Sequence, residues 1–204
     1  AQELKLNPVK GDIVRFVREI SYSFSDLAEQ KNILFSFPQA LAQLSTHFDH
    51  DKIERILFNL LSNAFKFTLE KGKVGVELQA RRKEKEMLLE IRVRDSGIGI
   101  PAEKQEKIFE RFFQQDVPGS LVNQGSGIGL SITREFVKLH QGTIHVESEL
   151  EKGSCFIVRL PFSEFETILT TEPLKIARNT EAAELNGVFQ QRNSRNGKPV
   201  WSYG

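Results

Sequence analysis

Cysteine is almost absent from the chain. Its 204 residues contain a single one, Cys155, which excludes an internal disulfide and a zinc site built from cysteines. The run from Ser154 to Val158 is typical of a strand, in which a lone cysteine serves more often as a small buried hydrophobe than as a nucleophile. This sparing use of cysteine is compatible with a reducing compartment.

Long hydrophobic runs and an excess of charge are also missing. No stretch approaches the roughly 20 apolar residues of a membrane-spanning helix, and residues 1–4 lack the pattern of a secretory signal. The formal net charge of +1 creates no general attraction to nucleic acid or to an anionic membrane. We therefore expect a soluble, cytoplasmic chain. The sequence leaves open whether segments upstream of it anchor the full-length protein in the inner membrane.

What is present is the pattern of a globular domain with 39% hydrophobic and 27% charged residues. Apolar residues recur at helical spacing over 12–29, 51–67 and 128–140, and alternate over 33–37, 44–48, 74–80, 89–93, 143–149 and 155–161. This order predicts an α+β fold, a two-layer α/β sandwich in which a mixed sheet of about five strands packs on three helices. We expect residues 1–162 to form the domain and residues 163–204 to be a C-terminal tail or linker.

One long connection interrupts this order. Residues 101–126 have no sheet pattern and contain Pro101, Pro118, Gly119 and Gly125. A connection of about 25 residues inside a compact domain is usually functional. The sequence therefore predicts a functional loop between the strand at 89–93 and the helix at 128–140.

The first motif that carries chemistry follows the strand expected over 89–93. Asp95 has the parity of the apolar residues in that strand, so its side chain should point toward the core. A buried carboxylate is costly unless donors meet it, and the exocyclic amine of adenine is such a donor. Gly97 and Gly99 leave room for a flat ligand against the backbone. Taken alone, this motif is equally typical of a turn in which Asp95 caps the following backbone.

The second motif is the glycine-rich run at residues 125–130, which opens the helix expected over 128–140. Glycines at alternate positions let backbone N–H groups converge on an anion, and the helix N-terminus adds partial positive charge. The spacing matches neither the P-loop nor the dinucleotide fingerprint. Taken alone, the run is as typical of a flexible hinge.

The third motif lies on the helix expected over 51–67. On a helical wheel, Asn59, Asn63 and Lys66 fall together at the edge of its apolar arc. An asparagine carbonyl can bind magnesium, and a lysine can pair with phosphate as a point charge. Taken alone, the three residues are more typical of a solvated helix edge.

Together, and in this order, the motifs resemble the GHKL ATP-binding superfamily, and within it the catalytic domain of sensor histidine kinases of two-component systems. Residues 59–68 are similar to the N box of those kinases, 95–99 to the G1 box, 108–113 to the F box and 125–130 to the G2 box. The resemblance covers roughly residues 4–162. It implies the Bergerat fold, with residues 101–126 as the ATP lid.

The resemblance also implies roles for single residues. Asp95 would bind the adenine amino group, Phe67 would lie against the adenine ring, Asn63 would hold Mg²⁺, and Asn59 and Lys66 would lie at the phosphates. The expected catalytic residues are Asn59, Asn63 and Lys66. The expected ATP-binding residues are Asn59, Asn63, Lys66, Phe67, Asp95, Gly97, Gly99, Ile100, Phe109, Arg111, Gly125, Ser126, Gly127, Ile128, Gly129 and Leu130. One departure is Gln114, where many relatives carry an arginine that reaches the phosphates, and Arg111 is the candidate substitute.

By resemblance, the partners are ATP, a phosphoacceptor histidine domain in the same full-length kinase, and a downstream response regulator. None of the four histidines stands in an acceptor-like segment, so we expect the acceptor domain to precede this chain. Without that domain the chain should be monomeric, whereas the full-length kinase should be a homodimer.

Two other functions fit the same motifs. A GHKL ATPase of the gyrase or mismatch-repair type places a water-activating glutamate four residues before the magnesium-binding asparagine. Here Asn59 occupies that position, and an amide cannot take a proton from water. A nucleotide-binding pseudokinase is disfavoured because all four boxes are intact.

Overall fold

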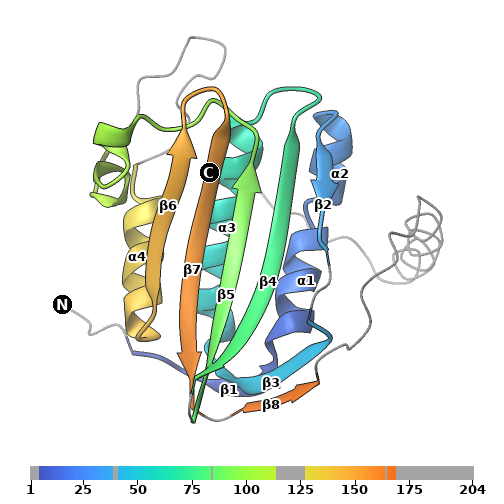
Figure 1. Cartoon of the computed structure of the whole chain (residues 1–204), viewed down its shortest axis with the longest axis vertical. Helices are drawn as coiled ribbons and strands as arrows, with labels where there is room; N and C mark the ends of the chain where they lie inside the picture. Colours follow the sequence, from blue (N-terminus) through green and yellow to red (C-terminus); the bar gives the residue numbers. More distant parts are fainter. Residues whose placement is uncertain (1–4, 39–40, 84, 114–126, 164, 169–204) are drawn as a thin grey trace, which may run out of the picture. The chain divides into compact units, whose positions relative to one another are not determined.

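The chain forms a layer of helices on one face of a β-sheet (Figure 1), as described by a computed structural model. The structure describes residues 5–38, 41–83, 85–113, 127–163 and 165–168, all within the unit of residues 1–170. The helices are α1 (Ile13–Tyr22), α2 (Ser25–Gln30), α3 (His50–Phe67) and α4 (Gly129–Leu139), with two short 3-10 helices, η1 (Ala102–Lys104) and η2 (Lys107–Phe109). The strands are β1 (Val9–Asp12), β2 (Leu34–Ser36), β3 (Gln43–Phe48), β4 (Lys73–Lys83), β5 (Glu86–Asp95), β6 (Thr143–Glu149), β7 (Gly153–Phe162) and β8 (Phe165–Ile168).

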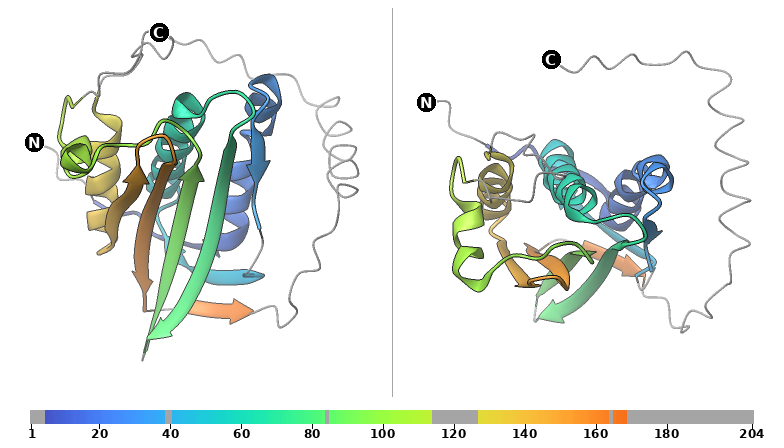
Figure 2. Two further views of the ribbon diagram at one scale, coloured as in Figure 1. Left: turned by 45° about the horizontal axis from the view of Figure 1, so that its top comes forward. Right: turned by 90° about the horizontal axis from the view of Figure 1, so that it is seen from above.

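The main sheet has the strand order β2-β4-β5-β7-β6. Strand β2 pairs with β4 in parallel, and the other pairs are antiparallel, so the sheet is mixed. Helices α1, α3 and α4 all cover the same face of this sheet, as the view from above shows (Figure 2). The predicted α+β fold, with its five-stranded mixed sheet, is confirmed.

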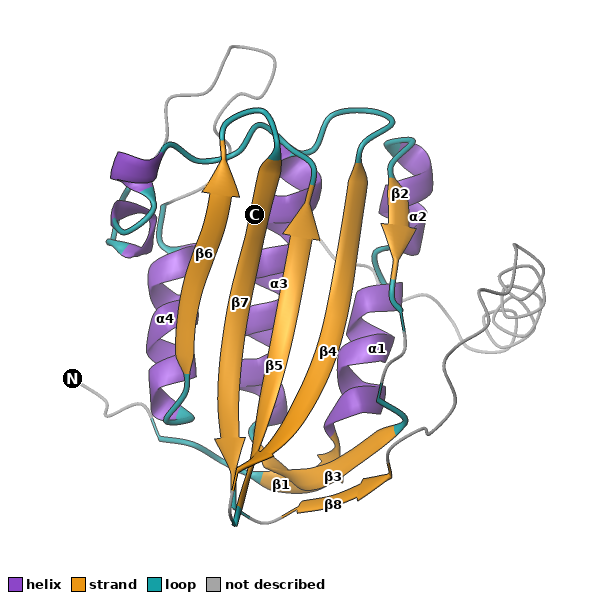
Figure 3. Ribbon diagram, in the orientation of Figure 1, coloured by secondary structure: helices purple, strands orange, loops and turns teal. Residues whose placement is uncertain are grey.

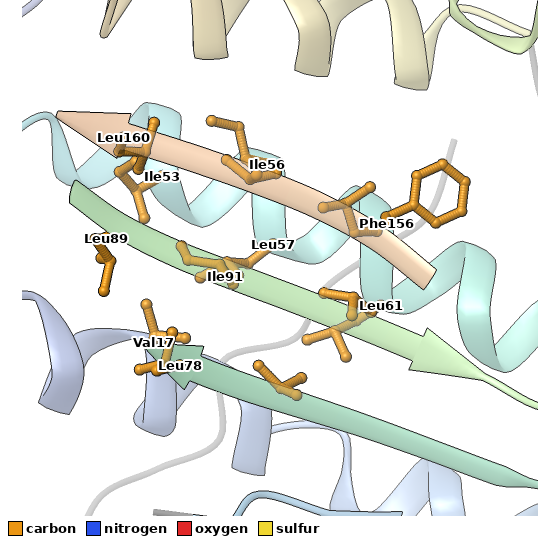
Figure 4. Close-up of a cluster of buried hydrophobic side chains, with 14 of the residues drawn as sticks. Val17, Ile53, Ile56, Leu57, Leu61, Leu78, Leu89, Ile91, Phe156 and Leu160 are labelled. Carbon is orange, nitrogen blue, oxygen red and sulfur yellow. The ribbon is translucent and has the colours of Figure 1, made fainter. Parts of the chain in front are cut away.

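The core lies between α3 and the central strands. Along β5, burial alternates from Met87 to Asp95, because successive side chains point to opposite faces of the sheet. The covered face of the sheet meets the apolar stripe of α3, where Ile56, Leu57 and Leu61 lie over Ile91 and Phe156 (Figure 4). The same alternation that builds this core turns the Asp95 carboxylate toward the helices.

The helix expected over 12–29 is two helices. Helix α1 ends at Tyr22, and the backbone N–H of Ser23 donates to the carbonyls of Glu19 and Ile20. The Phe24 side chain, 5% exposed, stacks on Phe65 with ring centroids 5.6 Å apart. The Phe24 ring therefore packs against α3 at the break between α1 and α2. The helical periodicity of the sequence did not reveal this break.

A second sheet, absent from the sequence expectation, has the order β1-β3-β8. Strand β3 pairs antiparallel with both neighbours and contributes nothing to the main sheet. Strand β8 lies within the segment expected to be a tail, so the folded part extends beyond residue 162 (Figure 3). The remainder of that segment, residues 169–204, lies outside the described residues.

Helix α3 begins slightly before the expected start. Its N-cap is Asp49, whose side chain accepts hydrogen bonds from the backbone N–H of Lys52 and from its Nζ at 2.7 Å. Burial alone would raise the pKa of the Asp49 carboxyl, but these bonds, with one from the backbone of Asn7, hold it below its usual value. This buried cap anchors the end of α3 opposite the motif-bearing end.

Candidate nucleotide-binding site

Three segments meet at one end of the main sheet: the end of β5, the C-terminal end of α3 and the start of α4 (Figure 3). Two close contacts join them. A Cβ on Gly97 would lie 2.3 Å from the Phe67 carbonyl oxygen, and a Cβ on Gly129 would lie 2.2 Å from Asn59 Oδ1. The three motifs, which are far apart in sequence, are therefore brought into one place.

Asp95 is a buried carboxylate at the centre of this arrangement, only 7% exposed. Its Oδ1 accepts hydrogen bonds from the backbone N–H of Gly97 at 2.8 Å and of Ser154 at 3.2 Å. Burial raises the pKa of Asp95 to about 6, and the two N–H bonds offset only part of that cost. The bond from Gly97 is the cap expected of a simple turn. Both of these bonds end on Oδ1.

The glycines after Asp95 make room for protein backbone. Gly97 lies against the end of α3, where the N–H of Ile98 donates to the Phe67 carbonyl at 3.3 Å. Gly99 has φ +72° and faces the Glu149 carbonyl oxygen, which would lie 2.0 Å from a Cβ. From the sequence, this space was expected to receive a flat ligand. Here the neighbouring elements approach the two glycines directly.

Substitution of Gly99 by alanine should therefore destabilise the domain by about 2 kcal/mol, since it adds backbone strain and a clash with a carbonyl oxygen. Gly75→Ala is the matched control. Its Cβ would meet the Ser36 side chain at 2.9 Å, and its φ is not positive. Thermal denaturation of the two variants and the parent measures the difference. Equal midpoints for Gly99→Ala and the parent would contradict this account of the loop.

The polar edge of α3 faces the same region. Asn59, Asn63 and Lys66 are all half-buried, as the helical wheel predicted. Asn59 Nδ2 donates to Thr133 Oγ1 on α4 at 2.9 Å, and Lys66 Nζ lies 5.1 Å from the ring centroid of Phe67. Two amides and one ammonium group are thus presented near the Asp95 loop.

The start of α4 is a candidate anion site. The helix begins at Gly129 with no side-chain hydrogen bond at its N-cap, Ile128. Gly127 has φ +68°, and its carbonyl accepts the N–H of Phe112 at 3.0 Å. The first-turn N–H groups, including that of Leu130, have no partner inside the helix and can bind an anion. Gly125 and Ser126, expected at this site, lie outside the described residues.

The described part of the expected lid, residues 101–113, is attached to the body of the domain. The N–H of Ile100 donates to Ser148 Oγ at 2.8 Å. Phe109, 7% exposed, packs edge-on against Phe156, and the Arg134 guanidinium lies 5.7 Å from the Phe109 ring centroid. Phe109 thus contributes to the core. Arg111 is exposed, while Gln114 and the rest of the lid to residue 126 lie outside the described residues.

Sequence reasoning missed three residues that support this site. Ser154 supplies a backbone donor to Asp95, Ser148 holds the start of the lid segment, and Thr133 binds Asn59. Each acts from an element distant in sequence from its partner. The only signal in the sequence for these three residues was a polar side chain at an inward position of a helix or strand. That signal is weak when the neighbouring element is not known.

Residues 48–164 match the family described as "Histidine kinase-, DNA gyrase B-, and HSP90-like ATPase". The chain belongs to this family. The matched range contains the Asp95 carboxylate, the amide-bearing edge of α3 and the glycine-rich start of α4.

Within the family, the similar proteins are histidine kinases. Sensor histidine kinase TmoS of Ectopseudomonas mendocina is 41% identical over 167 residues, 80% of this chain and 16% of that protein. Histidine kinase P4 of Formosa agariphila is 37% identical over 162 residues, 78% of this chain and 12% of that protein. The catalytic domain of histidine kinase ThkA matches with TM-score 0.65 and 29% identity, over 76% of this chain and 96% of that one. A further structure holds ThkA in complex with response regulator protein TrrA, with TM-score 0.60 and 28% identity, over 77% of this chain and 42% of that one.

The chain thus spans only a small part of the two full-length relatives. Among its described residues, no helix combines the length and apolar character needed to cross a membrane.

Proposed function

We propose that this chain binds ATP with Mg²⁺ and donates the γ-phosphoryl group to a histidine on a phosphoacceptor domain of the same full-length protein, in two-component signalling. One observation carries the proposal. The buried Asp95, the amide-bearing face of α3 and the uncapped start of α4 meet at one end of the sheet, through the contacts of Gly97 with Phe67 and of Gly129 with Asn59.

In this proposal each motif binds one part of the nucleotide. Asp95 accepts the exocyclic amine of adenine, and Phe67 lies against the ring. Lys66 and the N–H groups at the start of α4 bind the phosphates. In this proposal the γ-phosphoryl group lies beside the start of α4, and an acceptor histidine would approach it there.

Asn63 is the proposed magnesium ligand. It lies one helical turn from Asn59 on the half-buried edge of α3, and its side chain offers a hard carbonyl oxygen. Within the described ranges, no group of three or more His, Cys, Asp or Glu residues could hold a metal ion by itself. A site of one amide oxygen plus phosphate oxygens and water suits Mg²⁺, which seldom uses an all-protein cage. Bound there, the ion would neutralise charge on the phosphates.

The residues present favour transfer over hydrolysis. Asn59 stands where a hydrolase would need a general base, and its amide is bonded to Thr133. None of the four histidines resembles an acceptor. His140, for example, is 8% exposed, and its Nδ1 bonds the Phe136 carbonyl at 2.8 Å. The acceptor histidine must therefore come from another domain, which we propose lies in the same full-length protein.

We further propose a response regulator as the downstream partner, since the similar kinase ThkA forms a complex with one. The full-length protein would be a homodimer through its acceptor domain and would work in the cytoplasm, where ATP is available. The chain alone would be monomeric.

The direct test incubates the chain with γ-labelled ATP and Mg²⁺, with and without the acceptor domain of the full-length protein. We expect acid-labile, base-stable label on the acceptor domain alone, because a phosphorus–nitrogen bond is cleaved readily in acid. Stoichiometric labelling of the isolated chain, or rapid ATP hydrolysis without an acceptor, would favour the ATPase alternative.

A further inference from the structure

The Asn59 side chain is held by helix α4 as well as by its own helix. Its Nδ2 donates to Thr133 Oγ1 at 2.9 Å, and its Oδ1 abuts the backbone at Gly129, where a Cβ would lie only 2.2 Å away. Gly129 and Thr133 are four residues apart and so share one face of α4. The amide is therefore clamped with its nitrogen toward Thr133 and its oxygen toward the start of α4.

Thr133 is suited to orient another side chain. It is 1% exposed, so water does not compete effectively for its hydroxyl. A β-branched residue in a helix has few side-chain rotamers, which limits the positions that its hydroxyl can take. The partner, Asn59, is 74 residues away in sequence, and the bond joins α3 to α4 directly beside the glycine-rich motif.

We propose that Thr133 is a positioning residue that holds the Asn59 amide in place, with Nδ2 bonded to its hydroxyl and Oδ1 toward the start of α4. This inference rests on the proposed function, in which that space receives the phosphates. Phosphate oxygens accept hydrogen bonds and do not donate them. An amide turned this way offers its oxygen to a cation or to the water around it, and gives no N–H to phosphate.

The assignment separates two roles within the site, one at the end of β5 and one on α3. Asp95 and the adenine pocket supply affinity for the nucleotide, whereas the Asn59 amide acts at the phosphate end. Loss of the Thr133 hydroxyl frees the amide to rotate and present its NH₂ group. The rate of transfer should then fall while the affinity for ATP changes little.

Two substitutions isolate the hydroxyl. Thr133→Val keeps the shape of the side chain and removes its oxygen, and Thr133→Ser keeps the oxygen and removes the methyl group. The first measurement is hydrogen exchange of the Asn59 side-chain NH₂ by nitrogen-15 NMR of the chain without nucleotide. We expect exchange at least about tenfold faster in Thr133→Val, because one buried hydrogen bond is lost, and near-parental exchange in Thr133→Ser.

The second measurement compares phosphotransfer to the acceptor domain with ATP affinity. Thr133→Val should lower the transfer rate about tenfold, equivalent to one hydrogen bond, with the Kd for ATP within about threefold of the parent. Thr133→Ser should restore transfer. In an Asn59→Ala background, Thr133→Val should have no further effect on the rate, whereas general damage to the fold would lower it again.

The outcomes are distinguishable. If the parent chain does not transfer phosphate at all, the proposed function fails, and the exchange measurement still tests Thr133. Unchanged NH₂ exchange in Thr133→Val would overturn the positioning role. Equal transfer rates for Thr133→Val and Thr133→Ser, or an undiminished effect in the Asn59→Ala background, would also overturn it.

Discussion

Asp95→Asn should weaken ATP binding at least about tenfold, or about 1.4 kcal/mol. Asp95 Oδ1 is already bonded to the N–H groups of Gly97 and Ser154. The variant must therefore either place its NH₂ where the adenine amine needs an acceptor, or turn that NH₂ toward the two backbone donors. Both orientations lose at least one hydrogen bond. Calorimetric titration with ATP and Mg²⁺ measures the change.

Arg94→Gln is the matched control, because Arg94 precedes Asp95 on β5 and is exposed on the opposite face of the sheet. Its affinity for ATP should equal that of the parent. An unchanged affinity in Asp95→Asn would remove Asp95 from the adenine site and leave it as a turn cap.

The same substitution should stabilise the domain without nucleotide at neutral pH. Burial raises the pKa of Asp95 from its ordinary value of 3.8 to about 6. The folded state thus holds the proton more tightly than the unfolded state. Its contribution to stability is full below pH 3.8 and is lost as the pH rises through about 6. Asparagine, which is neutral at every pH, avoids this loss.

The melting temperatures of the variant and the parent at pH 4 and pH 7 measure this effect. Asp95→Asn should melt above the parent at pH 7, and the gap should close toward pH 4. A gap that is the same at both values would contradict the raised pKa. A residue whose replacement improves stability and removes binding is typical of a functional site.

Asn63→Ala should lower phosphotransfer on the order of 100-fold, since a lost magnesium ligand weakens both metal binding and charge neutralisation at the phosphates. The half-saturating Mg²⁺ concentration should rise in parallel. Asn63 is half-buried at the edge of α3, and alanine is a good helix former, so the fold should persist.

Ser62→Ala is the control for this prediction. Ser62 is the preceding residue of α3 and is also half-buried, but it points in a different direction around the helix. Its Mg²⁺ dependence should match that of the parent. If Asn63→Ala keeps the parental Mg²⁺ requirement, Asn63 is not the metal ligand.

The sequence by itself determined the features that follow from local backbone geometry. A period of two along β5 indicated that Asp95 points inward, because strand side chains alternate between faces. A period of 3.6 on α3 placed Asn59, Asn63 and Lys66 together at one edge. The order of the motifs along the chain was then enough to indicate the family and its fold.

Only the tertiary structure decided which distant segments meet. The partner of Asn59 lies on α4, and the second donor to Asp95 comes from Ser154, 59 residues away. Burial under the helix layer raises the pKa of Asp95, and packing against Phe65 accompanies the break at Phe24. The pairing of β3 with β8 likewise joins segments far apart in the chain. Periodicity reports which face of an element is buried, but the neighbour that covers that face depends on how the elements pack.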